Sequence, residues 1–267
     1  METVSFKLED ATVNDVCHHV VGFVIGDGGG LKSGGSGTLV RIGKMRGILT
    51  AGHVAQQLPD KVGILNFLNP RIQSHEVNIA NSCVVWDGVK EHAPDIAFLK
   101  LHLVDAGAIE AQQGVFYNLD KPREFKVEKP GNKLGLSHAI SGVVDEWKEV
   151  KQQGGSTKKY MNFGGIFGAS TDVKDFKEGN ADLTSLRIDY DKSLRVPQSY
   201  GGVSGSGLWE LCTELESGKP ISVRKRLCGV AFREHDKGTD VHTIVSNSKS
   251  AIASLVHEVK EKWPAEV

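Results

Sequence analysis

The sequence lacks the features that mark several large protein classes. Only four of its 267 residues are cysteine, and no two are spaced as Cys-x-x-Cys, which argues against zinc ribbons and thioredoxin-like redox sites. No apolar run approaches the roughly 20 residues of a membrane-spanning helix. Met1–Asp10 has neither the basic nor the apolar region of a signal peptide. We therefore expect no membrane partner and a cytoplasmic location.

An excess of charge of one sign is also lacking. The chain carries 32 Lys and Arg against 33 Asp and Glu, a net charge of −1, so it has no overall basic footprint for a nucleic-acid partner. Its ten histidines are scattered, and none has the spacing of a metal site, so we expect no metal and no cofactor. Hydrophobic residues make up 39%, which excludes a chain that is disordered throughout.

Glycine is abundant, at 31 residues, while proline is scarce, at 8, which favours many tight turns rather than a low-complexity linker. Short segments rich in Val, Ile, Thr and aromatic residues recur between these turns and predict an all-β protein. The predicted strands are His19–Ile25, Gly37–Ile42, Gly47–Thr50, Asn81–Trp86, Ile96–Leu103, Ile140–Val144, Leu183–Tyr190, Gly207–Leu211, Arg226–Phe232 and Val241–Val245.

Three segments depart from this pattern. Ser246–Lys262 places Ile252, Leu255, Val256 and Val259 on one face of a predicted helix, with lysines in its last turn. Asp27–Ser36 is rich in glycine but lacks the Lys and Ser or Thr of a phosphate-binding loop, so we predict a flexible hairpin. Lys151–Gly179 is predicted to be a long mobile stretch with one or two strands inside it.

Three short motifs carry the chemistry. Leu49-Thr50-Ala51-Gly52-His53 runs from a strand into a small-residue turn with a histidine. Pro94-Asp95-Ile96 puts an aspartate at the mouth of an apolar strand. Gly202-Val203-Ser204-Gly205-Ser206 puts a serine in a glycine-lined turn. Each motif alone is more often structural, but the order His, Asp, Ser is one of the recurrent orders of a catalytic triad.

The residue types fit nucleophilic catalysis. A serine hydroxyl attacks efficiently only when a base removes its proton, and an imidazole does this near neutral pH. A carboxylate holds the imidazole in the useful tautomer. Two rival interpretations of the serine turn fit less well. The first is the nucleophile elbow of α/β-hydrolases, which needs Gly-x-Ser-x-Gly and the order Ser, Asp, His. The second takes Ser206 as the nucleophile, but Ser206 lacks a glycine two residues before it.

Through these motifs the sequence resembles the chymotrypsin/trypsin-like serine proteases, and most of all their bacterial, stand-alone intracellular members. The resemblance covers about residues 15–260. It implies two antiparallel six-stranded β-barrels with a C-terminal α-helix at about residues 247–262. The first barrel, residues 1–118, would carry His53 and Asp95, and the second, residues 119–267, would carry Ser204. The resemblance also implies an oxyanion hole formed by the backbone amides of Gly202 and Ser204.

The chain departs from secreted and zymogen-type relatives at two positions. Val54 replaces the cysteine that usually follows the catalytic histidine, and Val203 replaces the aspartate that pairs with a newly cut N-terminus. We therefore predict no activation by N-terminal cleavage. Control would come from the oxyanion turn, from the mobile stretch or from a regulatory protein partner. In a reducing compartment the cysteines are expected to be free, although Cys212 and Cys228 flank a predicted hairpin and would pair in an oxidising one.

The pocket for the substrate side chain is weakly encoded. By resemblance it is built from Gln198–Gly201 and from two later strands around Val230–Glu234 and Asp240–Thr243. Asp240 favours a basic side chain before the cleaved bond, His242 favours an acidic one, and the two share a strand face, so they can also pair with each other. Asp240 is equally consistent with a hairpin cap. The sequence thus predicts Gln198, Asp240 and His242 as pocket residues and weakly favours a basic side chain, without deciding the preference.

Two functions follow. The first is a serine endopeptidase that hydrolyses proteins or peptides through His53, Asp95, Ser204 and an acyl-enzyme intermediate. The alternative is a catalytically silent double-barrel module for binding or sensing. The complete set of three motifs favours the first.

Overall fold

The computed structural model describes most of the chain in twelve stretches, and every statement below concerns these residues. They are 15–27, 30–66, 75–80, 82–88, 94–121, 125–126, 130–145, 148–153, 156–161, 166–189, 197–235 and 241–267. Of the residues predicted for the site, only Asp240 lies outside them.

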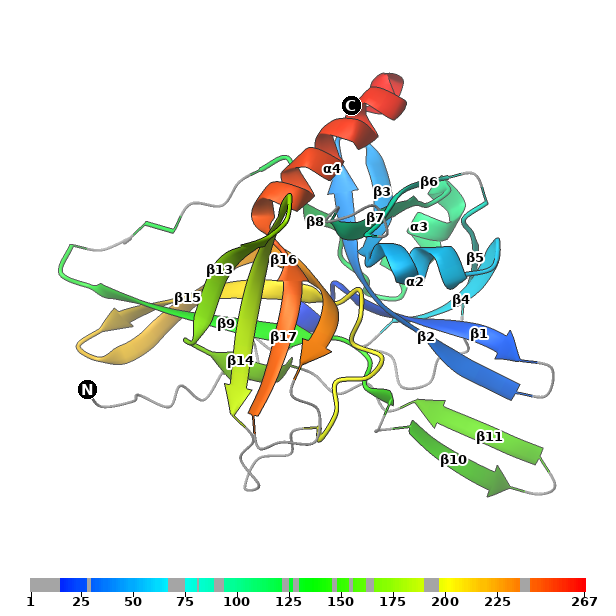
Figure 1. Cartoon of the computed structure of the whole chain (residues 1–267), viewed down its shortest axis with the longest axis horizontal. Coiled ribbons are helices and arrows are strands. Elements are labelled where there is room, and N and C mark those ends of the chain that lie inside the picture. Colours follow the sequence, from blue (N-terminus) through cyan, green and yellow to red (C-terminus); the bar gives the residue numbers. More distant parts are fainter. Residues whose placement is uncertain are drawn as a thin grey trace.

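The first sheet is built from the N-terminal part of the chain and curls around its own apolar face (Figure 1). Its strand order is β5-β4-β1-β2-β3-β7-β6, all antiparallel, and the short β8 adds to β2 in parallel. The strands are β1 (Val20–Asp27), β2 (Gly30–Ile42), β3 (Met45–Thr50), β4 (Lys61–Asn66), β5 (His75–Asn78), β6 (Cys83–Asp87), β7 (Asp95–Lys100) and β8 (Tyr117–Asn118).

The second sheet follows in the chain and is antiparallel throughout, in the order β12-β9-β15-β16-β17-β14-β13. A separate two-stranded hairpin, β10-β11, stands beside the sheets. The strands are β9 (Lys133–Ser141), β10 (Lys148–Gln153), β11 (Ser156–Met161), β12 (Ile166–Ser170), β13 (Val173–Glu178), β14 (Ala181–Asp189), β15 (Gly207–Glu216), β16 (Lys219–His235) and β17 (Val241–Asn247).

The prediction of an all-β protein with two antiparallel units and a C-terminal helix is confirmed. The helix is α4 (Lys249–Lys262), within the predicted range. The strand count differs from six and six, because β5, β8 and β13 extend the sheets. Two helices were not predicted, α2 (Gly52–Gln57) and α3 (Leu103–Ala111), and a 3₁₀ turn, η2 (Pro264–Glu266), follows α4. The division of the chain at residues 118 and 119 stays a prediction.

The two predicted loop regions contain more strand than the sequence suggested. Most of Asp27–Ser36 belongs to the long hairpin of β1 and β2, because backbone pairing reaches Asp27 and Gly30 at its tip. The stretch Lys151–Gly179 contains the second half of β10 and all of β11, β12 and β13, rather than one or two strands. Few residues there alternate between polar and apolar, so the strands depend on pairing with neighbouring strands. The sequence does not show that pairing.

One hydrophobic cluster joins both sheets and the C-terminal helix. It includes Leu49 from β3, Trp209 from β15 and Leu255 from α4, all fully buried. His19 lies beside this cluster, with its ring stacked on Trp209 and edge-on to Tyr117. The sheets therefore share a core, and side chains from one reach the other without crossing solvent.

Helix α4 begins at the second sheet and runs along the first (Figure 1). Its buried residues recur at helical spacing, which gives it one apolar face. The indole N–H of Trp86 donates to Glu258 at 2.6 Å, and the Lys262 ammonium donates to the Cys83 carbonyl at 2.7 Å. The helix thereby ties β6 to the C-terminal end of the chain.

All four cysteines are free, so Cys212 and Cys228 do not pair. The register explains why: Cys212 lies opposite Arg224, four residues before Cys228 on the facing strand. Burial raises the pKa of the Cys17 and Cys228 thiols to about 12, which keeps both protonated. Across the described stretches, no helix combines the length and the apolar character that a membrane crossing requires.

Candidate active site

His53 is placed by the end of β3 and the start of α2. Gly52 opens the helix against the neighbouring strand, and a Cβ there would lie 1.9 Å from the Trp86 carbonyl oxygen, so only glycine fits. His53 follows as the second residue of a short helix, where the sequence predicted a turn. The close approach of Gly52 to β6 brings His53 next to the start of β7.

Asp95 is the first residue of β7 and engages His53 with both carboxylate oxygens. Oδ2 lies 2.6 Å from His53 Nδ1, and Oδ1 accepts the backbone N–H of His53 at 2.8 Å. The Asp95 side chain is 12% exposed and that of His53 is 38% exposed. The carboxylate therefore fixes both the ring and the backbone of His53, and the ring edge that carries Nε2 is left for a partner.

Ser204 sits in a turn that is fixed by backbone bonds to β16. Gly205 donates its N–H to the Ala231 carbonyl at 2.7 Å, and Ala231 donates to the Ser206 carbonyl at 2.8 Å. Gly202 and Gly205 have φ of +88° and +92°, a region that favours glycine. A Cβ on Gly205 would lie 2.0 Å from the Ser36 carbonyl oxygen and 2.1 Å from Thr50 Oγ1. The glycines of the motif are thus required by the backbone.

The amides of Gly202 and Ser204 have fixed directions. The Gly201 carbonyl accepts the N–H of Asp145 at 2.8 Å, and the Val203 carbonyl accepts the N–H of Ser206 at 2.8 Å. Because a trans peptide points its N–H opposite to its C=O, these bonds also orient the N–H groups of Gly202 and Ser204. Neither N–H donates to any residue that the structure describes. The two amides are therefore available to an oxyanion.

Ser204 lies in the turn before β15 of the second sheet and His53 in the helix after β3 of the first, and both segments contact Gly35 of β2. A Cβ on Gly35 would lie 3.0 Å from the side chain of Val54, the residue after His53, and 3.1 Å from the Ser204 carbonyl oxygen. The Ser204 hydroxyl donates weakly to the Phe232 carbonyl, at 3.4 Å. Among the described residues no hydrogen bond joins it to His53. The histidine and the aspartate are thus bonded, and the serine lies close by with its hydroxyl turned toward β16.

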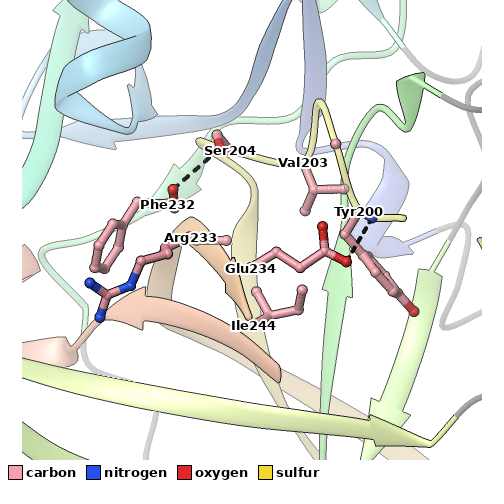
Figure 2. A pocket seen from close by; sticks show the side chains of 9 residues that line it. Tyr200, Val203, Ser204, Phe232, Arg233, Glu234 and Ile244 are labelled. Atoms are coloured by element: carbon pink, nitrogen blue, oxygen red, sulfur yellow. Dashed lines mark hydrogen bonds between the residues drawn. The ribbon is translucent and has the colours of Figure 1, made fainter. Parts of the chain in front are cut away.

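A pocket of about 240 Å³ opens beside Ser204 (Figure 2). Figure 2 shows Glu234 reaching across it toward Tyr200, while the guanidinium of Arg233 points away from the Glu234 carboxylate. The guanidinium pairs with Glu178. The residues that line the pocket are Tyr200, Gly201, Val203, Ser204, Ala231, Phe232, Arg233, Glu234 and Ile244.

The Glu234 carboxylate is buried at this pocket and held by three donors. It accepts the backbone N–H of Tyr200 at 3.1 Å and, more weakly, the Ser199 hydroxyl at 3.4 Å, and it lies 2.9 Å from His242 Nδ1. Its side chain is 6% exposed and that of His242 is 2% exposed. Burial, together with the Glu234 charge, raises the pKa of the Tyr200 phenol above its usual value. The charged group at the pocket wall is therefore Glu234, with His242 behind it.

The predicted pocket residues have different positions. His242 is not among the lining residues but contacts two of them, Glu234 through Nδ1 and Tyr200 edge-on, whereas Gln198 is exposed and does not line the pocket. Asp240, which the sequence singled out, lies outside the described residues. The predicted pocket included Glu234 only as the last residue of the segment Val230–Glu234. A glutamate in a strand belongs to no motif, and only the fold shows that it lines the same pocket as Ser204.

Ser206, the rival nucleophile, is fully buried beneath the turn. A Cβ on Gly142 would lie 1.8 Å from Ser206 Oγ, so the chain leaves no room for a substrate there. In the described part of the chain, no group of three or more His, Cys, Asp or Glu side chains is arranged to hold a metal ion.

No protein-family model and no curated protein sequence matches the chain. Among solved structures, similarity is found to the protease of tobacco vein mottling virus, with 12% identity, a TM-score of 0.43, and coverage of 95% of this chain and 87% of that one. Similarity is also found to a thermostable serine protease, AL20, from an extremophilic microorganism, with 11% identity, a TM-score of 0.47, and coverage of 91% and 96%.

Proposed function

We propose that the protein is a serine endopeptidase, with Ser204 as nucleophile, His53 as general base and Asp95 as the group that orients His53. The observation that carries the proposal is the bidentate contact of Asp95 with His53, at 2.6 and 2.8 Å, next to a serine turn whose amides are fixed. A hydrogen-bonded acid and base beside a serine with two oriented N–H donors is the arrangement that acyl transfer requires.

The reaction begins with a rotation of the Ser204 side chain about its Cα–Cβ bond, which exchanges its weak bond to Phe232 for one to His53 Nε2. The hydroxyl then attacks the substrate carbonyl while His53 takes its proton. The negative charge that forms on the carbonyl oxygen is stabilised by the N–H groups of Gly202 and Ser204. His53 returns the proton to the leaving amine, and water hydrolyses the acyl-enzyme by the same steps.

The pocket beside Ser204 supports a preference for lysine or arginine before the cleaved bond. Its walls include Val203, Ala231 and Ile244, which suit the methylene stem of such a side chain, and Glu234 supplies a carboxylate for the cationic end. An acidic side chain would meet the Glu234 charge in a buried setting, where like charges repel strongly. The buried position of His242 behind Glu234 argues against its direct contact with an acidic substrate.

One observation favours the alternative of a silent binding or sensing module: the Ser204 hydroxyl bonds to Phe232 and not to His53. If that rotamer were permanent, the nucleophile would stay inactive. The proposed regulatory partner would then act by changing it. The two functions make opposite predictions for covalent labelling.

The test is a fluorophosphonate probe, which reacts with activated serines, applied to the wild-type chain, Ser204→Ala, His53→Ala and Ser206→Ala. We expect labelling of the wild type and of Ser206→Ala, and none of the other two. Because the Ser206 hydroxyl makes no hydrogen bond to a described residue, Ser206→Ala is a matched control in the same turn. Absence of labelling in the wild type would support the silent module.

A further inference from the structure

Each sheet sends one buried polar side chain into the catalytic segment of the other. The first is Asn247, at the end of β17 in the second sheet, and its partner is the backbone of Asp95 in the first. Asn247 Oδ1 accepts the N–H of Asp95 at 3.0 Å, and Asn247 Nδ2 donates to the Asp95 carbonyl at 2.5 Å. Asn247 is fully buried. Its amide therefore pairs with Asp95 as a neighbouring strand would.

Asp95 pairs with Asp87 of β6 on one side, but on the side of β3 the ladder stops short of it. The ladder between β3 and β7 ends at Thr50 and Ala97, two residues from Asp95. Asn247 supplies a donor and an acceptor at this position, where the chain has turned away into α2. A backbone held on both polar groups cannot shift along the strand, so the carboxylate stays opposite His53.

The second side chain is Ser36, in β2 of the first sheet, and its partners lie in the serine turn of the second. Its backbone N–H donates to the Ser204 carbonyl at 2.8 Å, and its hydroxyl donates to the Gly202 carbonyl at 2.8 Å. The same hydroxyl accepts the N–H of Val143 at 2.8 Å. Ser36 therefore holds the carbonyls of Gly202 and Ser204, the two residues whose N–H groups would bind the oxyanion.

We propose that Ser36 and Asn247 are reciprocal positioning residues that set the placement of the nucleophile relative to the base across the two sheets. The inference rests on the proposed function. Asn247 lies opposite Val230 in β16, to whose carbonyl it donates at 3.4 Å, and the next residue, Ala231, holds the serine turn. The clamp on Asp95 and the support of Ser204 thus share one strand.

The two residues act on different halves, so their removal leaves different signatures. Asn247→Ala frees the Asp95 backbone and disturbs the bond between Asp95 and His53. Ser36→Ala loosens the serine turn and leaves that bond intact. Each variant is expected to react with the fluorophosphonate probe about tenfold more slowly, the effect of one hydrogen bond that positions the reacting groups.

The experiment measures probe labelling against pH, the thermal midpoint and the NMR signal of the proton on His53 Nδ1, which moves far downfield when shared with a carboxylate. Ser246→Ala is the control for Asn247→Ala, and Ser141→Ala is the control for Ser36→Ala. Both control serines are buried, and neither hydroxyl bonds to a described residue. Labelling rates are compared at temperatures equally far below the thermal midpoint of each variant, so that differences in stability alone do not change the rate.

We expect Asn247→Ala to shift or abolish the His53 signal and to displace the pH midpoint of labelling, and Ser36→Ala to slow labelling with the signal unchanged. Labelling at the control rate in either variant, or the same signature in both, would overturn the proposal. If Asn247→Ala does not fold, Asn247→Asp keeps the acceptor for the Asp95 N–H, and the same comparison with Ser246→Ala decides.

A wild type that is not labelled would count against the proposed function and not against this inference. The His53 signal then decides alone, because it reports the bond to Asp95 without any catalysis. Loss of the signal in Asn247→Ala and its persistence in Ser246→Ala would support the clamp. Persistence in both would overturn it.

Discussion

The two halves of the candidate site are held by different kinds of contact. His53 and Asp95 are joined through a carboxylate, which bonds once to a ring nitrogen and once to a backbone amide. Ser204 is held by bonds between backbone groups, in a turn that contains two glycines with positive φ. A side-chain carboxylate therefore holds the proposed base, whereas chain conformation, with one added hydrogen bond from the Ser36 hydroxyl, holds the proposed nucleophile and oxyanion donors.

This difference predicts which substitutions each half tolerates. On the side of the base, the exchange of one polar atom removes the chemistry and leaves the fold, because the surrounding strands are held by other contacts. In the serine turn, a side chain added in place of a glycine collides with neighbouring atoms, so it displaces the turn and lowers the stability of the fold.

Asp95→Asn is expected to lower the rate of probe labelling by about 10⁴, with little change in stability. The amide has the size of the carboxylate but holds the imidazole in the wrong tautomer. Labelling kinetics and urea unfolding of the same preparations measure both effects. A variant that unfolds, or that labels within tenfold of the wild type, would contradict the claim that a polar exchange beside His53 removes the chemistry and leaves the fold.

Gly205→Ala is expected to cost at least about 3 kcal/mol of unfolding free energy, because its Cβ would meet Ser36 and Thr50 at a position of positive φ. Gly218→Ala is the matched control. It also has positive φ, at +80°, but nothing lies within 4 Å of the added atom, so a cost of about 1 kcal/mol is expected. Equal costs, measured by urea unfolding, would show that φ alone limits both positions.

His19 lies where the halves meet and predicts a loss of stability in acid. Burial, and then the charge of Lys225, lowers the pKa of His19 to about 3, and its Nδ1 donates to the Val115 carbonyl. His19 binds a proton below about pH 6.5 in the unfolded chain but only near pH 3 in the folded chain. The contribution of neutral His19 to the unfolding free energy is therefore complete above pH 6.5 and is lost as the pH falls from 6.5 toward 3.

The expected loss from His19 between pH 7 and pH 5 is about 2 kcal/mol. His19→Phe keeps a ring against Trp209 and removes the titration, so its unfolding free energy should fall less over the same range. Urea unfolding of both chains at the two pH values measures the difference. Identical pH dependence would mean that His19 has the same pKa in the folded and the unfolded chain.

Glu234→Gln is expected to reduce cleavage after lysine and arginine by about tenfold relative to uncharged residues, since it removes one charged partner. Competing peptides that differ only in that residue give the ratio directly. Arg233→Gln is a control at the neighbouring position, where the guanidinium bonds to Glu178 and not to Glu234. A ratio that stays unchanged in Glu234→Gln, or that falls as much in Arg233→Gln as in Glu234→Gln, would contradict the assignment of Glu234 as the group that selects the cationic side chain.

The sequence predicted the parts of the site that have local causes. The glycines around Ser204 and before His53 are required by positive φ or by close approach, so they form motifs that are visible in the chain. The apolar face of α4 was predicted for the same reason, because helical spacing is local. Helix α2 was missed, since it has only six residues and no capping side chain.

The remainder depends on contacts between distant segments. Glu234 and His242 meet from two different strands, β16 and β17, and Asn247 reaches Asp95 across 152 positions in the chain. No motif in the adjacent sequence identifies any of these residues as part of the site. In the stretch Lys151–Gly179 the sequence predicted one or two strands without placing them, because β12 and β13 are each held by a partner strand rather than by their own composition.

The most direct test of the central claim is cleavage of a peptide library by the wild-type chain and by Ser204→Ala, with every new amino terminus quantified by mass spectrometry. The account predicts new termini in the wild-type digest alone, mostly preceded by lysine or arginine. The same termini at the same yield with Ser204→Ala, or none with either chain, would contradict it.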